Sequence, residues 1–236
     1  MAAEGGLAVD SVLARDWLLA FGVAAHAEKR RLTTLDSAIG DGDHGVNLCR
    51  GLSRVRELLL KDKDGEAHGT VGELFTDAGA LLRSHVGGAS GVLYGSAFQA
   101  IGGALPVAEV DAVRFADALD AGLAATVRLG AAIPGDKTMV DAFTPAVTAF
   151  RDFRSWHTLT SGQVPCAARD LTDAAEAAAV AARDGALATI PMQARKGRAS
   201  YLGPRSIGHL DPGAASTELL FSSLARAAKG WAVTSA

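Results

Sequence analysis

The feature that most constrains the fold is a spacing of apolar residues by three and four positions along almost the whole chain. Leu13, Trp17, Phe21 and Ala24 show it first. This spacing places side chains on one face of an α-helix, whereas a strand surface needs an alternation of period two, and no convincing alternation occurs. The sequence therefore predicts an all-α protein.

The spacing predicts about eight helices. A capping box at Thr70 and Glu73 and an N-cap followed by proline at Asp211 and Pro212 mark two helix starts, and Pro165 suits a first helical turn. Ala-rich faces favour close packing in a bundle. The expected helices lie near residues 13–24, 52–59, 71–82, 90–103, 110–127, 138–153, 165–183 and 212–227.

The connections divide into two kinds, all within one domain expected over residues 1–236. Residues 61–69 and 154–164 are expected to be plain loops. Others are dense in glycine and polar groups and are where chemistry is expected on a helical scaffold. These are residues 36–47, 87–91, 130–138 and 195–213.

Charge and composition exclude several classes of protein. Lys and Arg number 23 against 26 Asp and Glu, a net charge of −3, which argues against a partner that is nucleic acid or an anionic membrane. No apolar run approaches the roughly 18 residues of a membrane span, and the first residues lack a signal-peptide pattern. Cys49 and Cys166 fit neither a disulfide framework nor a zinc site. A soluble cytoplasmic protein is expected.

The most informative polar segment carries three carboxylates, Asp36, Asp41 and Asp43, within eight positions. Like charges packed so closely are costly unless a cation lies among them, and hard oxygen ligands suit Mg²⁺ or Ca²⁺. An EF-hand fails because Val46 and Leu52 would occupy its glycine and glutamate positions. A solvated turn in which an aspartate caps a helix is the alternative, and the third carboxylate weakens it.

Two glycine-rich segments suggest phosphate binding. Residues 86–91 open an expected helix, whose free N–H groups attract anions, although this signal alone is weak. Residues 130–138 come close to a P-loop, but Asp136 stands before Lys137 and no strand precedes them, so a P-loop is excluded. Lys137 is either a phosphate contact or a partner of Asp136.

A basic segment completes the pattern. Arg195, Lys196, Arg198 and Arg205 concentrate positive charge in a chain that is acidic overall. A solvated face is the alternative, and nucleic-acid binding would need interleaved aromatic residues that are absent. Paired with an acidic metal loop, the segment suggests the second side of a nucleotide phosphate site, which is what phosphoryl transfer requires.

Together these motifs resemble the L subunit of bacterial dihydroxyacetone kinase, from about residue 10 to about residue 230. The resemblance rests on four ordered stretches: Asp-Ser-Ala-Ile-Gly-Asp-Gly-Asp-His-Gly, Gly-Gly-Ala-Ser-Gly-x-Leu-Tyr-Gly, Pro-Gly-Asp-Lys-Thr-Met, and Ala-Arg-Lys-Gly-Arg-Ala-Ser-Tyr-Leu-Gly followed by Gly-His-x-Asp-Pro-Gly. It implies an antiparallel barrel of eight helices with the nucleotide in the loops at one end.

The resemblance also implies the site residues. Asp36, Asp41 and Asp43 would hold two Mg²⁺ ions that bridge the nucleotide phosphates, and with Arg198 they form the expected catalytic set. The expected contacts to ADP or ATP are His44, Gly45, Asn47, Ala89, Ser90, Gly130, Met139, Arg198, Asp211, Pro212 and Gly213.

The implied activity is half of a kinase reaction. In such kinases a separate K subunit holds the sugar covalently on a histidine, and no such domain is expected within 236 residues. The chain alone is therefore expected to be inactive. A free-standing L-type chain favours bound ADP that is recharged by a phosphocarrier M subunit of the phosphotransferase system, and exchanging ATP is the alternative. The sugar also stays open between dihydroxyacetone and a longer ketose.

Two other functions fit parts of the sequence. A regulatory module that docks a transcription regulator according to its nucleotide state can coexist with the kinase role. The kinase domain of a fatty-acid kinase is disfavoured, because those chains resemble this one around the aspartate loop but lack the Ala-Arg-Lys-Gly-Arg-Ala-Ser-Tyr stretch.

Overall fold

The computed structural model describes residues 9–61, 70–107, 110–160 and 167–234, and helices make up most of them. In this part of the chain the only β-type pairing is an isolated bridge between Val9 and Val110. The elements are α1 (Ser11–Ala27), α2 (Lys29–Ile39), α3 (His44–Lys61), α4 (Val71–His85), α5 (Gly88–Gly103), α6 (Ala112–Gly130), α7 (Val140–Thr160), α8 (Ala167–Ala188), the 3₁₀ helix η1 (Arg198–Ser206) and α9 (Pro212–Thr234).

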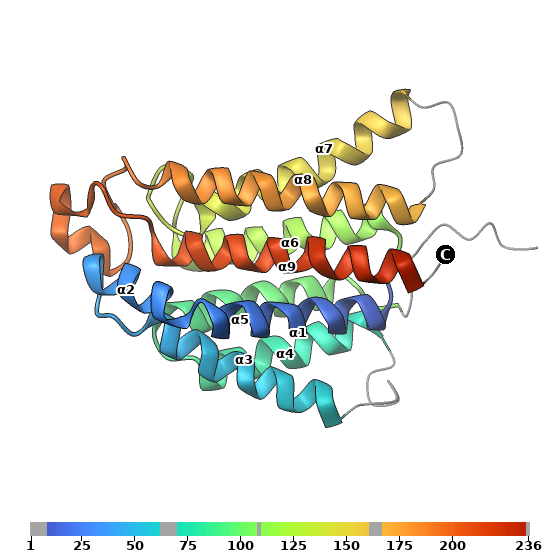
Figure 1. Cartoon of the computed structure of the whole chain (residues 1–236), viewed down its shortest axis with the longest axis horizontal. Helices are drawn as coiled ribbons and strands as arrows, with labels where there is room; N and C mark the ends of the chain where they lie inside the picture. The colour runs from blue at the N-terminus through green and yellow to red at the C-terminus, as the bar shows by residue number, and fades with distance from the viewer. Residues whose placement is uncertain (1–8, 62–69, 108–109, 161–166, 235–236) are drawn as a thin grey trace, which may run out of the picture.

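Eight of these helices form a closed ring. Contacts run from α1 to α3, on through α4, α5, α6, α7, α8 and α9, and from α9 back to α1. Neighbours in the ring run antiparallel (Figure 1). Helix α2 stands outside the ring, beside α3 and α9. The predicted all-α antiparallel barrel of eight helices is therefore confirmed, and α2 is an addition to it.

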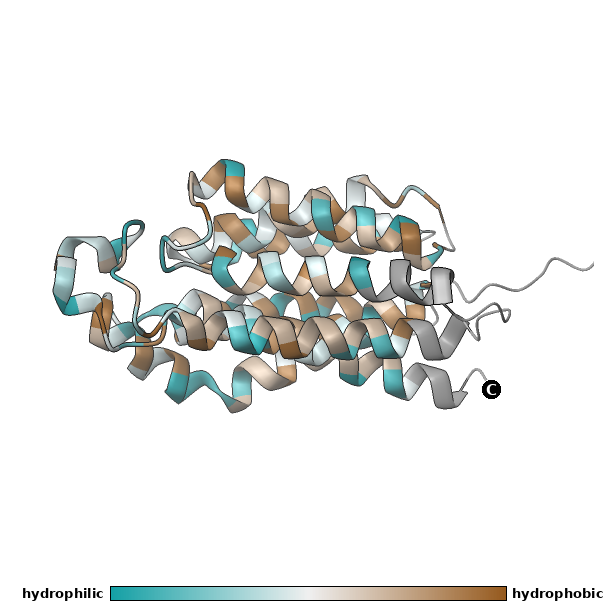
Figure 2. Cartoon of the chain, turned by 90° about the horizontal axis from the view of Figure 1, so that it is seen from above, coloured by the Kyte–Doolittle hydropathy of each residue, from teal (hydrophilic) through white to brown (hydrophobic). Residues whose placement is uncertain are grey.

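An aromatic cluster fills the barrel. The ring of Trp17 packs edge-on against those of Phe75, Phe98 and Phe115, with centroids 5.4, 6.5 and 5.9 Å away. Its indole N–H donates to the carbonyl of Leu220 at 2.8 Å. One side chain on α1 thus contacts four other helices. Hydrophobic and hydrophilic residues are interspersed along the helices, as expected for helices that each turn one side to a core (Figure 2).

Three expectations for the connections differ from the structure. The segment 36–47 is mostly helical, because α2 continues to Ile39 and α3 begins at His44. Helix α7 extends to Thr160 through much of the loop expected at 154–164. The segment 195–213 contains η1. Lys61 is the last residue of α3, while residues 62–69 and Pro165 lie outside the described part of the chain.

The chain reverses at the same end of the barrel wherever a glycine-rich connection occurs. The connections α2–α3, α4–α5, α6–α7 and α8–α9 all lie there (Figure 1). The barrel therefore gathers the polar segments that are far apart in the sequence. No helix in the described part of the chain is long and apolar enough to cross a bilayer.

Helices α4 and α5 approach so closely that two glycines of α5 make a matched test. A Cβ at Gly102 would lie 2.5 Å from the Gly72 carbonyl oxygen and 2.4 Å from Thr76 Oγ1, whereas a Cβ at Gly103 would meet nothing within 4 Å. We expect Gly102→Ala to lower the free energy of unfolding by about 1–3 kcal/mol. Gly103→Ala should leave it unchanged or raise it by up to about 1 kcal/mol. Urea unfolding checks both, and equal effects would contradict the close approach.

Candidate functional site

A cleft of about 510 Å³ opens at the loop end of the barrel. Its walls come from α2, the first residues of α3, α5 and α9, the end of α6, the 131–139 connection and η1. Each of the polar segments identified in the sequence contributes to it. The site is therefore assembled from chain reversals that the helical ring holds together.

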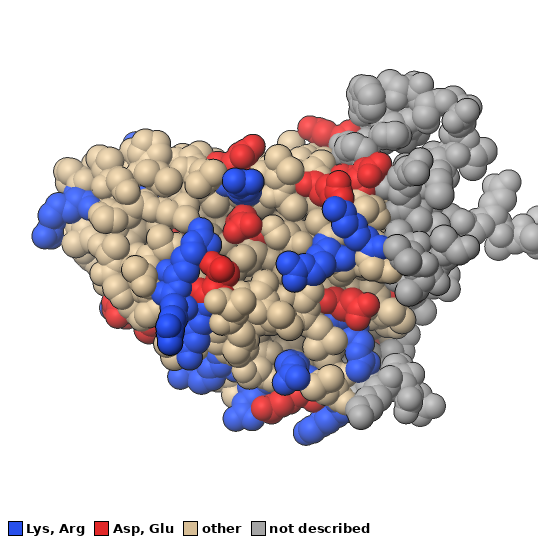
Figure 3. Space-filling model, in the orientation of Figure 1, with Lys and Arg blue, Asp and Glu red and all other residues tan. Residues whose placement is uncertain are grey.

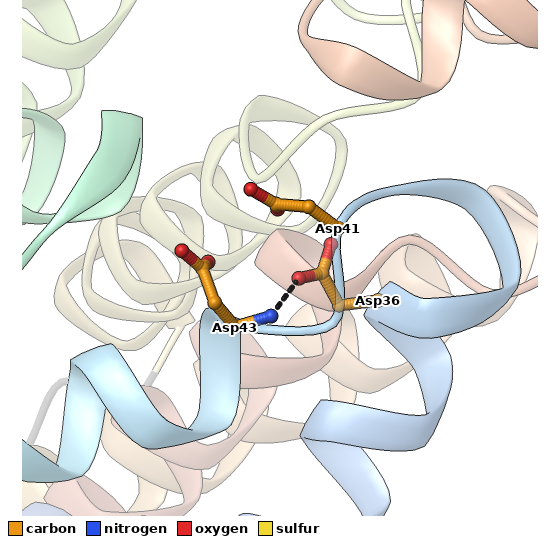
Figure 4. Close-up of side chains that lie close together, drawn as sticks. All are labelled: Asp36, Asp41 and Asp43. Atoms are coloured by element: carbon orange, nitrogen blue, oxygen red, sulfur yellow. Dashed lines mark hydrogen bonds between the residues drawn. The ribbon is translucent and has the colours of Figure 1, made fainter.

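The acidic corner of the cleft lies between α2 and α3. Asp36 is in the last turn of α2, and its Oδ2 accepts the backbone N–H of Asp43 at 2.8 Å (Figure 4). The same oxygen accepts the backbone N–H of His44 at 3.0 Å. The carboxylate therefore caps α3, where a negative charge is favoured. Gly42, with φ +74°, makes the tight reversal between the two helices.

The same corner fits a hard divalent cation. One carboxylate oxygen from each of Asp36, Asp41 and Asp43 lies within 4.8 Å of the other two. Asp36 is buried, while Asp41 and Asp43 are exposed. Three oxygen donors without nitrogen or sulfur are the ligand type that Mg²⁺ prefers, and Mg²⁺ typically completes its shell with water and phosphate oxygens.

The start of α5 forms a second wall. Gly87 precedes the helix and supplies no side chain to cap it, and Gly88, Ala89 and Ser90 line the cleft. The first backbone N–H groups of a helix have no partner within the helix, and together with the helix dipole they attract anions.

The basic segment faces the acidic corner. Arg198, at the start of η1, forms an ion pair with Asp41, with 3.1 Å between Nη2 and Oδ2. Its side chain is 70% exposed, so the pair stabilises the fold by no more than about 1 kcal/mol. Lys196 also lines the cleft. The contact shows that η1 reaches across to the metal ligands while its cation stays accessible.

A buried polar layer lies beneath these groups. His44 Nε2 is 3.0 Å from Ser216 Oγ, and the Tyr94 hydroxyl is 2.7 Å from Ser216 Oγ and 3.0 Å from Thr217 Oγ1. Burial raises the pKa of Tyr94 to about 12. Burial also lowers the pKa of His44, although the nearby Asp36 carboxylate opposes this. Both side chains are therefore neutral at pH 7, and the floor of the cleft carries no charge from them.

The first turn of α9 closes the cleft. Asp211 is buried, and its Oδ2 accepts the backbone N–H of Ala214 at 2.7 Å as the N-cap of the helix. Burial raises the pKa of Asp211 to about 7, against the lowering effects of that hydrogen bond and of Lys137. The carboxyl of Asp211 thus titrates near neutral pH. Pro212 and Gly213 follow it along the wall.

Most of the predicted site residues meet in this cleft. The exceptions are Gly45, where a Cβ would lie 2.3 Å from the Lys29 carbonyl oxygen, and Asn47, whose Oδ1 accepts from Arg50 Nη2 at 2.7 Å. Gly45 lets α3 approach α2, and Asn47 lies beside the α4–α5 connection at Gly87. The predicted residues that line the cleft are Asp36, Asp41, Asp43, His44, Ala89, Ser90, Gly130, Met139, Arg198, Asp211, Pro212 and Gly213.

A largely apolar wall of the cleft has no counterpart in the sequence motifs. It consists of Val92 and Leu93 on α5 and Leu129 on α6 beside Met139, together with Thr126. Helical spacing cannot separate residues that face a cleft from those that face the core, because both are apolar. The one usable signal in the sequence is that Val92 and Leu93 lie one helical turn after Ala89 and Ser90, which places all four on one side of α5.

Fold and site together define a helical domain with a metal-binding corner and anion-binding backbone groups in one cleft. Residues 38–226 match the family model of the DAK2 domain. The chain is 41% identical over 221 residues to the PEP-dependent dihydroxyacetone kinase, ADP-binding subunit DhaL, of Escherichia coli K12, covering 91% of this chain and 95% of that one. The chain therefore belongs to the DAK2 domain family, which includes the ADP-binding DhaL subunits of dihydroxyacetone kinases.

Other comparisons agree. The ADP-binding subunit DhaL of PEP-dependent dihydroxyacetone kinase 1 of Listeria innocua is 39% identical over 209 residues, covering 88% of this chain and 92% of that one. The crystal structure of the C. freundii dihydroxyacetone kinase in complex with AMP-PNP and Mg²⁺ aligns with a TM-score of 0.64 at 24% identity. The alignment covers 96% of this chain and 36% of the C. freundii chain. The structural match supports the fold.

The acidic corner predicts a stability effect of Mg²⁺. Relieving repulsion among the three carboxylates should make Asp43→Asn as stable as wild type, or more so, without metal. Millimolar Mg²⁺ should raise the Tm of wild type and raise that of Asp43→Asn much less, because the ion binds only the folded state. Thermal unfolding with and without EDTA checks this. An equal rise in both proteins would contradict the site.

Proposed function

We propose that the chain, as a single domain of 236 residues, is the nucleotide-binding, phosphoryl-transferring subunit of a dihydroxyacetone kinase. It acts on dihydroxyacetone held covalently by a separate K subunit and is inactive without it. One observation carries the proposal: three carboxylates, free helix amides and a basic segment surround one cleft. The ADP-binding names of the DhaL relatives support it.

The geometry of the cleft supports the proposed residue roles. Asp36, Asp41 and Asp43 would hold two Mg²⁺ ions, which neutralise phosphate charge when bound. The backbone at Ala89 and Ser90 would bind phosphate oxygens at the start of α5. The apolar wall of α5 and α6 offers a surface for the base.

Arg198 is the proposed cationic group of the phosphoryl transfer. It is the planar donor best suited to phosphate, and its ion pair with Asp41 is exposed and weak enough to exchange for one. His44, Gly45, Asn47, Gly130, Met139, Asp211, Pro212 and Gly213 remain the proposed further nucleotide contacts.

For the donor, we favour ADP kept as a bound cofactor and recharged by a phosphocarrier M subunit of the phosphotransferase system. The relatives that match along almost their whole length carry PEP-dependent or PTS-dependent names. Exchanging ATP is the alternative, and a nucleotide-dependent contact with a transcription regulator is a second role of the same site. Such a phosphoenolpyruvate-linked subunit acts in the cytoplasm. Interspersed basic and acidic side chains on the face drawn in Figure 3 suit a partner other than nucleic acid.

The metal assignment has a matched test. Asp41 and Asp117 each pair with an arginine, Arg198 and Arg151 respectively, but Asp117 lies outside the cleft. Asp41→Asn should weaken Mg²⁺-dependent ADP binding at least tenfold, or about 1.4 kcal/mol, and should abolish dihydroxyacetone phosphorylation in the presence of a K subunit. Asp117→Asn should match wild type. Calorimetry and a coupled assay check this, and unchanged ADP affinity in Asp41→Asn would remove the assignment.

The phosphoryl donor is decided by nucleotide retention. If ADP is a bound cofactor, the purified chain should keep about one equivalent through extensive dialysis against Mg²⁺ buffer, and added ATP should not displace it. Quantifying the nucleotide released on denaturation measures this. Loss of ADP and ready uptake of ATP would favour the exchanging version.

A further inference from the structure

The Pro-Gly-Asp-Lys-Thr-Met segment between α6 and α7 contains a buried cation. The side chain of Lys137 lies against the connection between α8 and α9, and the residue is 1% exposed. Its backbone has φ +62°, a conformation that residues other than glycine seldom adopt. A strained backbone and a buried charge persist only when the surrounding structure holds both in place.

The ammonium group of Lys137 joins two other segments. Its Nζ donates to the Thr189 carbonyl oxygen at 2.5 Å and to the His209 carbonyl oxygen. Thr189 follows the end of α8, and His209 precedes the first turn of α9. Beyond the two sequence-based alternatives, a phosphate contact and a partner for Asp136, Lys137 thus joins two main-chain carbonyls.

The rest of the segment is arranged to hold Lys137 still. Asp141 Oδ1 accepts the Gly135 N–H at 2.5 Å, and its Oδ2 accepts the Thr138 N–H at 2.8 Å. The Asp136 carboxylate accepts the Ile133 N–H at 3.0 Å. These contacts fold the segment on itself, so that its lysine is presented to the neighbouring loops from a rigid base.

Lys137 also acts on the turn Asp211–Gly213. The Asp211 N–H donates to Thr189 Oγ1 at 3.0 Å, so that the residue whose carbonyl binds Lys137 also holds the start of α9. Lys137 and Asp141 are the charged groups whose fields act on the buried Asp211 carboxyl, in opposite directions. Lys137 favours the carboxylate, and Asp141 favours the neutral acid.

We propose that Lys137 is a positioning residue of the nucleotide site. Its ammonium fastens the Asp211–Gly213 turn to the end of α8 and is a positive charge that favours the charged form of the Asp211 carboxyl. The inference deepens the proposed function, because that turn is among the proposed nucleotide contacts. Lys137 also lines the cleft, and the inference assigns it an action through Asp211 and through the backbone carbonyls that its ammonium binds.

The first measurement needs no nucleotide. The pKa of Asp211, about 7 when folded, exceeds its ordinary value of 3.8. The contribution of this group to stability is therefore lost as pH rises from about 4 to about 7, and it is constant above. Lys137→Met should raise the folded pKa further. The unfolding equilibrium constant of Lys137→Met, divided by that of wild type, should then be constant below pH 7. Above pH 7 this ratio should rise by up to tenfold per pH unit.

Urea unfolding from pH 5 to 8.5 measures this ratio. Lys229→Met is the matched control, because it removes a lysine that pairs with Glu176 at the far end of α9. In an Asp211→Asn background the climb above pH 7 should vanish, which separates the titration of Asp211 from that of Lys137 itself. A ratio that does not change with pH would reduce Lys137 to a packing residue and overturn the proposal.

The second measurement tests whether the hydrogen bonds of Lys137 to the two carbonyls affect nucleotide binding. At pH 8, Lys137→Met should weaken Mg²⁺-dependent ADP binding about tenfold or more, and Lys229→Met should match wild type. Lys137→Gln keeps a hydrogen-bond donor without the charge. It should lose less affinity than Lys137→Met while showing the same pH-dependent climb, and it carries the test if Lys137→Met does not fold.

The outcomes are distinguishable from those of the proposed function. Failure of the wild-type chain to bind ADP would contradict the proposed function, whereas the unfolding ratios test the link from Lys137 to Asp211 without nucleotide. Wild-type ADP affinity in both Lys137 variants would overturn the positioning role.

Discussion

The carboxylate of Asp36 holds two helix ends together, and the geometry of the cleft depends on it. By accepting two backbone N–H groups at the start of α3, it fixes the reversal that carries Asp41 and Asp43. A carboxylate bound in this way serves the fold and the candidate metal site at once. Because α2 stands outside the ring, this cap and the close approach at Gly45 are what orient it against the barrel.

The charges around the cleft are arranged in opposition. Three acidic side chains face Arg198 and Lys196 across the opening, while His44 and Tyr94 below them are neutral. Such a site is unfavourable by itself, because like charges repel and free helix amides lack partners. The aromatic core around Trp17 lies apart from it and supplies the stability that the cleft does not.

Apolar spacing predicted the helices of the ring where that spacing was dense, the family resemblance implied the barrel, and the spacing failed where the signal was thin. Helix α2 buries only Leu32, Asp36 and Ile39 and begins with three exposed basic residues, so apolar spacing predicts no helix there and its last residues fall in the loop expected at 36–47. The motif residues came together as expected because loops at one end of a ring must meet. The role of Lys137 could not be predicted, since its partners are backbone carbonyls, which no residue pattern encodes.

Closure of the ring through the contact between α1 and α9 has a practical consequence. Helix α1 begins and α9 ends on the side of the barrel away from the cleft (Figure 1). An affinity tag, a fluorophore or a surface tether attached beyond either helix would point away from the opening. The molecule can therefore be immobilised at either of these points with its cleft presented to solution, which suits binding measurements with large macromolecular partners.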